Sequence, residues 1–194
     1  MENIRQNEHP SPFPKYRIEV SYVTGKTLVH PDGRTVTLLD SGTDDQGDYL
    51  LVRHTIVKQG PMYGPHWHPV LQETFTVQEG LMRFVIDGKE TIVEQGGQAR
   101  ILPTQIHQFW NVSTDRLVAL HEIRPPGQHW NMFELIHKLE CEGKLNNKGI
   151  PSNPLWLGAA WRVMDGYLAG PPRILQTAVL GGLARLADLL KYRV

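Results

Sequence analysis

The sequence predicts a mainly β domain, built as a sandwich or a double-sheet barrel, with α-helices at its C-terminal end. The first observation is a series of short runs rich in valine, isoleucine, threonine, phenylalanine and leucine, with no helical pattern between them. The second is the set of turn signals that separates these runs, such as Pro31-Asp32-Gly33 and Asp87-Gly88. Many short strands at close spacing are typical of antiparallel double-sheet folds. The expected strands cover residues 16–23, 34–39, 49–57, 72–78, 81–87, 90–93 and 116–123.

The pattern changes after residues 125–127, which read Pro-Pro-Gly. From there apolar residues repeat at the helical period, and a polar loop at residues 143–154 interrupts them. The chain is therefore expected to consist of an N-terminal arm, a β-barrel domain and a C-terminal helical extension that packs on the barrel or on a dimer partner. A membrane-surface helix is the alternative, and a polar face without a strong basic surplus argues against it. The expected helices are residues 129–142, 155–168 and 174–190; the expected units are residues 1–15, 16–125 and 126–194.

Composition excludes several classes of protein. Of the 194 residues 40% are hydrophobic and 21% are charged, which is typical of a globular domain. The formal net charge is zero, so the basic surplus that nucleic-acid binding requires is missing. The chain has a single cysteine and therefore no intrachain disulfide. We find no signal peptide and no apolar stretch long enough to span a membrane, so we expect a cytoplasmic protein.

The residues that carry chemistry lie in the middle of the chain. His66 and His68 are two residues apart, a spacing that places both imidazoles on one face of a strand. Glu73 follows a proline-containing turn and is able to return to the same place. Two imidazole nitrogens and a carboxylate are common ligands of divalent transition metals. His107, at a turn-to-strand junction, is the best candidate for a third histidine.

The segment around these residues resembles the first sequence motif of the cupin superfamily. In that motif a glycine precedes a His-x-His pair, and a glutamate and a second glycine follow at set spacing. Here Gly60, His66, His68, Glu73 and Gly80 fill every fixed position.

A second segment resembles the second cupin motif. Gly96, His107 and Asn111 fit its spacing. The family's proline falls on Leu102 and its glycine falls on Thr104, so this sequence departs from the motif in the turn and keeps the ligand.

The resemblance implies a cupin-type double-stranded β-helix, or jelly-roll barrel, with one divalent metal held by His66, His68, Glu73 and His107. Fe(II) or Mn(II) is favoured, and Zn, Ni or Cu also suits such a ligand set. The family pattern further suggests that Glu73 leaves the metal and acts as a catalytic base. The alternative is a barrel interior in which the same residues are ordinary polar groups and bind no metal.

Further residues are expected near the site with less direct support. His54 and His121 lie in apolar strands and are more often structural, and Trp67 should point away from the site. The residues expected to line the barrel mouth and bind substrate are Tyr63, Gln72, Arg83, Gln105 and Phe109.

Two classes of function remain open at this point. The first is a metal-dependent enzyme acting on a small organic molecule, either an oxygenase that cleaves a C–C bond or a lyase or isomerase. The second is a non-catalytic small-molecule-binding or sensor protein. A metal-free sugar epimerase would need a His–Asp pair, and no aspartate lies near the three histidines in sequence. A homodimer is expected in each case, with residues 1–23 and the C-terminal helices as contact elements.

Overall fold

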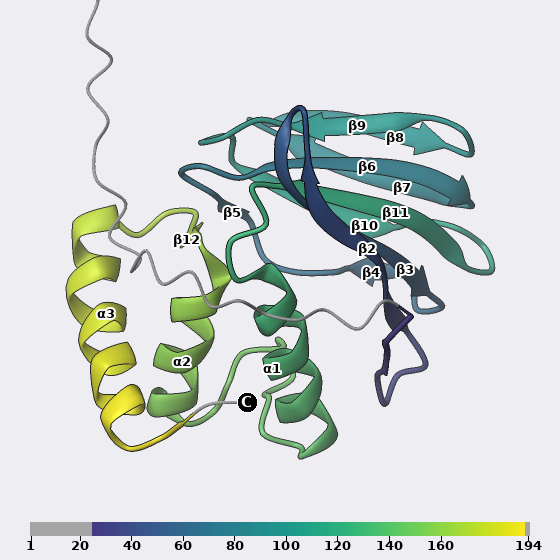
Figure 1. Cartoon of the computed structure of the whole chain (residues 1–194). Coiled ribbons are helices and arrows are strands. Elements are labelled where there is room, and N and C mark those ends of the chain that lie inside the picture. Colours follow the sequence, from purple (N-terminus) through teal and green to yellow (C-terminus); the bar gives the residue numbers. More distant parts are fainter. Residues whose placement is uncertain (1–24, 193–194) are drawn as a thin grey trace, which may run out of the picture.

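The computed structural model describes residues 25–192 and shows a β-barrel with three helices beside it (Figure 1). The strands are β1 (Thr27–Val29), β2 (Thr35–Asp44), β3 (Gly47–Ile56), β4 (Gly60–Pro61), β5 (His66–Trp67), β6 (Gln72–Glu79), β7 (Leu81–Ile86), β8 (Lys89–Glu94), β9 (Gln98–Ile101), β10 (His107–Asn111), β11 (Leu117–Arg124) and β12 (Tyr167–Leu168). The helices are α1 (His129–Cys141), α2 (Pro154–Met164) and α3 (Arg173–Leu189).

The strands form two antiparallel sheets. The first has the order β1-β2-β3-β11-β6-β9, and the second has the order β12-β5-β10-β7-β8, with β4 also paired to β10. Neighbours in a sheet are often far apart in sequence, since β11 lies between β3 and β6, and β10 lies between β5 and β7. The mainly β fold with C-terminal helices that the sequence predicts is thereby confirmed.

The core lies between the sheets and follows the alternation of each strand. In β11 every second residue is buried, from Leu117 and Ala119 to Ile123. The second sheet contributes Phe84 and Phe109, which face each other across β7 and β10. Burial of these apolar side chains stabilises the barrel by roughly 25 cal/mol for each Å² removed from water.

Sequence reasoning missed several short elements. The two-residue strands β4, β5 and β12, and the short strands β1 and β9, are too brief for an alternating pattern to show. The helix expected at residues 155–168 ends earlier, at Met164, because Asp165 takes a left-handed conformation with φ of 50° and residues 167–168 then form β12. The expected strand at residues 16–23 and the arm at residues 1–15 lie outside the described residues.

Helix α1 packs against the first sheet, and α2 and α3 lie beside α1 (Figure 1). Trp130 and Phe133 of α1 pack in one apolar cluster with residues of β1 to β3, including Leu28 and Val36. Helix α2 then packs on α3, and Gln176 of α3 hydrogen-bonds the main chain of Leu168 in β12. The C-terminal extension is therefore continuous with the barrel through α1.

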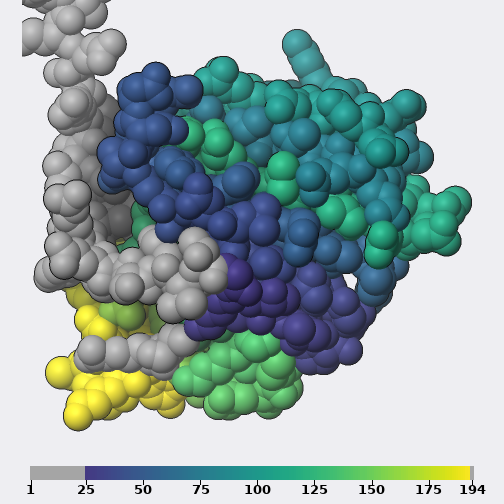
Figure 2. Space-filling model, turned by 45° about the vertical axis from the view of Figure 1, so that its right-hand side comes forward, coloured from purple at the N-terminus to yellow at the C-terminus, as the bar shows by residue number. Residues whose placement is uncertain are grey.

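Ion pairs join the first described residues to α1. Lys26 pairs with Glu134, and Glu140 accepts from Arg34 and lies 2.7 Å from Nδ1 of His30. In Figure 2 the purple start of the described chain lies directly against green residues of the helical region. No helix within residues 25–192 is long and apolar enough to cross a membrane.

Candidate metal centre

The four predicted ligands come together at one end of the barrel. His66 lies in β5, His68 directly follows it, Glu73 lies near the start of β6, and His107 begins β10. Strands β5 and β10 are paired with His66 opposite His107, so the sheet itself brings two histidines together. One possible ligand atom from each residue lies within 4.8 Å of the others. The arrangement is the one that the motif spacing predicts.

Each histidine is oriented by a main-chain carbonyl. Nδ1 of His66 donates to the carbonyl oxygen of Gly64 at 2.9 Å. Nδ1 of His68 donates to Asp165 at 3.0 Å, and Nδ1 of His107 donates to Gln105 at 3.0 Å. A carbonyl is only an acceptor, so each Nδ1 carries the proton and each Nε2 keeps its lone pair. This second layer of hydrogen bonds is typical of metal-binding histidines.

The atoms left facing the site lack hydrogen-bond partners. Nε2 of His68, Nε2 of His107 and Oε2 of Glu73 are all buried and unpaired. Oε2 of Glu73 lies 2.9 Å from Nε2 of His107 and 3.7 Å from Nε2 of His68. With the protons on Nδ1, all three atoms are hydrogen-bond acceptors that face one another. This arrangement requires a cation or an additional proton between them. The donor set of three imidazoles and one carboxylate therefore fits a divalent transition metal.

The electrostatics favour the ligand forms of three of the four residues. Burial lowers the pKa of His66 to about 3, helped by His107 and His68, and burial also lowers the pKa of His68. Burial raises the pKa of Glu73, but the surrounding histidines outweigh it and hold that pKa well below its usual value. These three side chains are thus neutral imidazoles and a carboxylate at neutral pH. Burial lowers the pKa of His107, yet the nearby carboxylate of Glu73 outweighs burial and raises it.

Two further histidines form a hydrogen-bonded chain that ends on Glu73. Nε2 of His121 donates to Oε1 of Glu73 at 3.0 Å, and Nε2 of His54 donates to Nδ1 of His121 at 3.2 Å. The pair is buried, and burial lowers the pKa of His54 well below its usual value, so that ring is neutral. The two histidines hold one carboxylate oxygen and leave the other facing the ligands. They are hydrogen-bonded structural residues, as the sequence predicts, with the added role of orienting Glu73.

The helical extension also reaches the site. The carbonyl that orients His68 belongs to Asp165, at the end of α2, and the side chain of Asp165 accepts from the main-chain nitrogen of Gln128 at 2.5 Å. A Cβ on the next residue, Gly166, would lie 2.7 Å from Nδ1 of His68, so only glycine fits there without displacement. His129, the first residue of α1, packs edge-on against His68 with ring centroids 5.3 Å apart. Sequence reasoning missed all of these residues.

The turn before His107 keeps its shape despite the departures from the motif. Thr104 stands where the family has glycine and takes a positive φ of 71°. Its main-chain nitrogen donates to the carbonyl oxygen of His68 at 2.7 Å, which ties the two motifs together. Asn111 completes the second motif as a structural residue, since its amide binds main-chain groups of Ile56 and Ser113.

Comparison with known families agrees with this geometry. Residues 52–123, which include all four candidate ligands, match the model of the cupin domain family. This segment of the chain is a cupin domain. No curated protein matches the chain significantly.

Solved structures with similar folds have low sequence identity to this cupin. An RmlC-like cupin from Shewanella frigidimarina is 15% identical, with 51% of this chain and 82% of that chain covered and a TM-score of 0.43. KdgF from a Halomonas species is 15% identical, with coverages of 47% and 78% and a TM-score of 0.40. A cupin-superfamily sugar phosphate isomerase from Silicibacter pomeroyi is 19% identical, with coverages of 53% and 66% and a TM-score of 0.40.

Two of the predicted substrate-binding residues lie toward the interior of the cupin barrel. Phe109 is buried and packs on Phe75, with ring centroids 4.9 Å apart. Tyr63 is part-buried and packs edge-on against Phe109 at 6.3 Å. Trp67 points away from the candidate ligands, as expected, and stacks on Tyr167 at 4.8 Å.

The prediction for Arg83 is wrong. Its neighbours Met82 and Phe84 are buried in the core, so strand alternation places Arg83 on the outer face of the second sheet. There its guanidinium lies 4.5 Å from the ring centroid of Trp110 and pairs with Glu90 at 2.8 Å. Arg83 therefore does not line the barrel mouth.

Gln72 and Gln105 are also placed differently from the prediction. Gln72 precedes the inward-facing Glu73, so it points outward, where it accepts from Arg100 at 2.6 Å. The Gln105 side chain is held within its own turn by Asp87 and the main chain of Leu102. Its contribution to the site is the main-chain carbonyl that orients His107.

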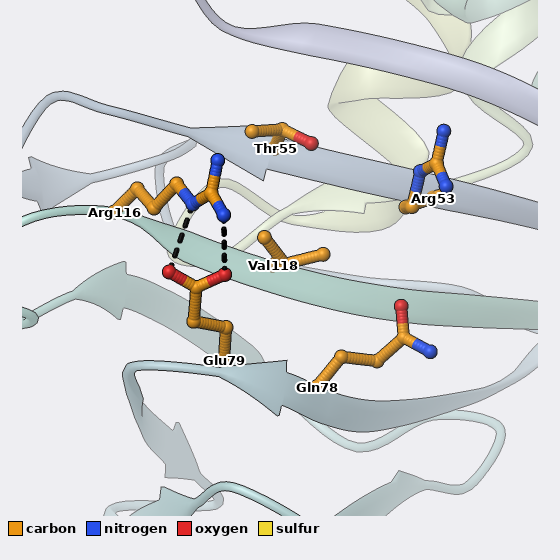
Figure 3. Close-up of a pocket in the computed structure, with 6 residues that line it drawn as sticks. All are labelled: Arg53, Thr55, Gln78, Glu79, Arg116 and Val118. Carbon is orange, nitrogen blue, oxygen red and sulfur yellow. Dashed lines mark hydrogen bonds and ion pairs between the residues drawn. The ribbon is translucent and has the colours of Figure 1, made fainter.

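One surface hollow lies away from the candidate ligands. It measures about 430 Å³ and is lined by Arg53, Thr55, Gln78, Glu79, Arg116 and Val118 (Figure 3). Arg116 makes two hydrogen bonds of 2.8 Å to Glu79 across it. Arg53 and Thr55 flank the inward-facing His54 in β3, so the hollow lies on the outer face of the first sheet. We assign it no part in the chemistry of the metal centre.

Proposed function

We propose that this cupin is a metal-dependent enzyme that acts on a small organic molecule bound at the barrel mouth. The reaction we propose is oxygenase-like cleavage of a C–C bond, or else a lyase-like or isomerase-like conversion. One observation carries the proposal: three buried atoms without hydrogen-bond partners, on His68, His107 and Glu73, meet within a few ångströms beside His66. Unpaired buried polar groups lower stability, and they are retained where a ligand pairs with them.

The metal we propose is Fe(II) or Mn(II), with Zn, Ni or Cu as further candidates. Imidazole nitrogens suit iron, nickel, copper and zinc, and the carboxylate oxygen suits manganese as well. His66, His68, Glu73 and His107 would hold the ion, which leaves one or two coordination positions open on a metal that prefers five or six ligands. Bound there, the ion would supply Lewis-acid or redox chemistry.

The protein's own residues would bind, orient and transfer protons. Oε2 of Glu73 faces the site, whereas Oε1 is held by His121, so Oε2 is the atom that would hold the ion and, once released from it, would accept a substrate proton. The apolar rings of Phe75 and Phe109 lie in the barrel core and would exclude water from the reacting groups.

Metal analysis and a variant of Glu73 test this function. We expect purified protein to carry about one equivalent of transition metal, and removal by a chelator should abolish turnover of candidate enols or flavonols measured as oxygen uptake or product formation. Glu73→Gln should abolish turnover while some metal remains bound. Glu79→Gln is the matched control, because Glu79 lies on the same strand and pairs only with Arg116 on the outer face. Full activity of Glu73→Gln would exclude the catalytic role.

A non-catalytic binding or sensor protein is the second candidate. It is favoured by the apolar rings near the site, Phe75, Phe84 and Phe109, which offer packing and no additional proton-transfer group. Tight binding of a small molecule by the metal-loaded protein, with neither oxygen uptake nor product, would establish this candidate over the enzyme.

We also propose a homodimer that uses α3. This helix exposes a set of apolar side chains to solvent: Ile174, Leu175, Val179, Leu186 and Leu189. Sedimentation should show a dimer at micromolar concentration, and replacing Leu175 and Leu189 by glutamate should give monomers. A monomeric wild-type protein would exclude the dimer. The cytoplasmic location expected from the sequence stays a prediction.

A further inference from the structure

His129 is a buried residue that neither cupin motif contains. It begins α1, and its main-chain nitrogen donates to the carbonyl of Pro126 at 3.0 Å. Its side chain enters the space beside the candidate metal centre, and only 3% of the residue is exposed. The helical extension thus contributes an imidazole to a site whose other members come from the barrel.

The His129 ring lies against residues that form or support the candidate metal centre. Its centroid lies 5.3 Å from that of His68 and 6.3 Å from that of His121, with the rings edge-on. Phe133, one turn farther along α1, packs against it at 5.7 Å. An imidazole carries at least one N–H donor in either protonation state.

One nitrogen of this ring has no partner. Nδ1 of His129 is buried and makes no hydrogen bond, whereas Nδ1 of His66, His68 and His107 each donates to a main-chain carbonyl. His129 is also absent from the group of four whose ligand atoms converge, so a metal held by that group would not satisfy it. A buried imidazole nitrogen left unpaired beside a candidate metal centre indicates a partner that is not part of the protein.

We propose that Nδ1–H of His129 donates a hydrogen bond to a small oxygen- or nitrogen-bearing ligand bound at the open position of the metal centre. This inference rests on the proposed function, because it needs the metal to be bound. It assigns α1 a direct part in ligand binding and makes His129 a determinant of which ligands the centre accepts.

Azide is a suitable probe, because it binds metal ions and its nitrogen atoms accept hydrogen bonds. Azide affinity should be measured by visible absorption on the Co(II)-substituted full-length protein. We expect His129→Phe, which keeps a ring and removes both nitrogens, to bind azide about tenfold more weakly, the effect of one charge-assisted hydrogen bond. Co(II) affinity should remain within about threefold of wild type, because a hydrogen bond to the ligand alone leaves the four metal ligands unchanged.

Two conservative variants locate the donor atom. In His129→Asn the side-chain amide occupies the place of Nδ1 and should restore azide affinity to within about threefold of wild type. In His129→Gln the amide lies one bond farther out, and azide affinity should fall about tenfold as in His129→Phe. If His129→Phe does not fold, as judged by thermal unfolding, the comparison of azide affinity between His129→Asn and His129→Gln tests the same hydrogen bond.

The results that would overturn the inference are distinct from those that would overturn the proposed function. Equal azide affinity in wild type, His129→Phe and His129→Gln would show that the nitrogen pairs only with water. A tenfold loss of Co(II) affinity in His129→Phe would show that the ring acts on the metal ligand His68 instead. Failure of the wild-type protein to bind Co(II) would remove both the metal-dependent function and this inference.

Discussion

At the scale of single residues, Thr104 carries a conformation that its side chain disfavours. A positive φ brings Cβ close to the following carbonyl oxygen, and the energetic cost is larger for a β-branched residue than for most others. The turn requires the conformation nevertheless, because the main-chain nitrogen of Thr104 donates to the carbonyl of His68 at 2.7 Å. The cupin motif has glycine at this place, and here the turn keeps its shape with threonine.

We expect Thr104→Gly to stabilise the protein. Relief of about 1–2 kcal/mol of left-handed strain should exceed the roughly 0.5–1 kcal/mol that glycine costs through the unfolded chain. The free energy of unfolding, measured with urea on metal-free protein, should therefore rise by about 0.5–1 kcal/mol. Thr104→Val keeps the β-branch and should bring no gain. An equal gain in both variants would show that φ is not the source of the effect.

Gly166 is a second residue whose missing side chain matters. A Cβ there would lie 2.7 Å from Nδ1 of His68 and 2.9 Å from its Cε1. We expect Gly166→Ala to tilt that imidazole and weaken metal binding about tenfold or more, the size of effect that displaced ligand-orienting groups produce. Gly64→Ala is the control, since a Cβ at Gly64 meets nothing within 4 Å. Metal competition titrations measure both, and equal affinities would contradict the prediction.

At the scale of elements, the contact of α2 with α3 depends on one glycine. A Cβ on Gly158 would lie 2.5 Å from the main-chain carbon of Leu183 and 2.6 Å from the nitrogen of Ala184. The close approach of the two helices therefore explains a glycine inside α2. Gly182, inside α3, has open space around it, so no contact explains the helix propensity lost there.

The two glycines should respond oppositely to alanine. Gly158→Ala should lower the free energy of unfolding by about 1–3 kcal/mol, because it forces the helices apart. Gly182→Ala should raise it by about 0.5–1 kcal/mol, because alanine is the better helix former. Thermal or urea unfolding of the two variants tests the pair, and a stabilising Gly158→Ala would disprove the close helix contact.

At the scale of the whole molecule, buried histidines make stability depend on pH. His30 lies between the β1–β2 turn and α1, where burial lowers its pKa and the charge of Arg34 lowers it further. The unfolded chain binds a proton near pH 6.5, whereas the folded protein resists it. The contribution of His30 is therefore complete above pH 6.5 and is lost as pH falls toward the lowered pKa.

Unfolding of metal-free protein at two pH values tests this dependence. Between pH 7.5 and pH 5.5 we expect the wild type to lose more of its free energy of unfolding than His30→Asn. His54 acts in the same direction, since burial and the neighbouring His121 lower its pKa, so the wild type should be less stable at the lower pH overall. Identical losses in wild type and variant would show that folding does not lower the pKa of His30.

Much of the barrel and the four candidate ligands could be predicted because their signals are local. Alternation within β7 and β11 indicates strands, and the spacing of His66, His68 and Glu73 indicates one face and one site. Short strands such as β5 were not predicted, because a segment of two residues is too short to show an alternating pattern. The helix expected at residues 155–168 was predicted too long. The left-handed conformation of Asp165 ends it and β12 pairs with β5 beyond it, and neither feature shows in the sequence pattern.

By itself the sequence determined a mainly β domain, its helical extension and the candidate ligands His66, His68 and Glu73, since each depends on residues close together along the chain. Only the tertiary structure decided that Arg83 faces outward, because a shift of one residue in register reverses the face of every side chain. Only the tertiary structure brought His121 to Glu73, Asp165 to His68 and His129 to the same site, over separations of tens of residues. Those contacts arise when sheets and helices pack on a shared core, and no local pattern records them.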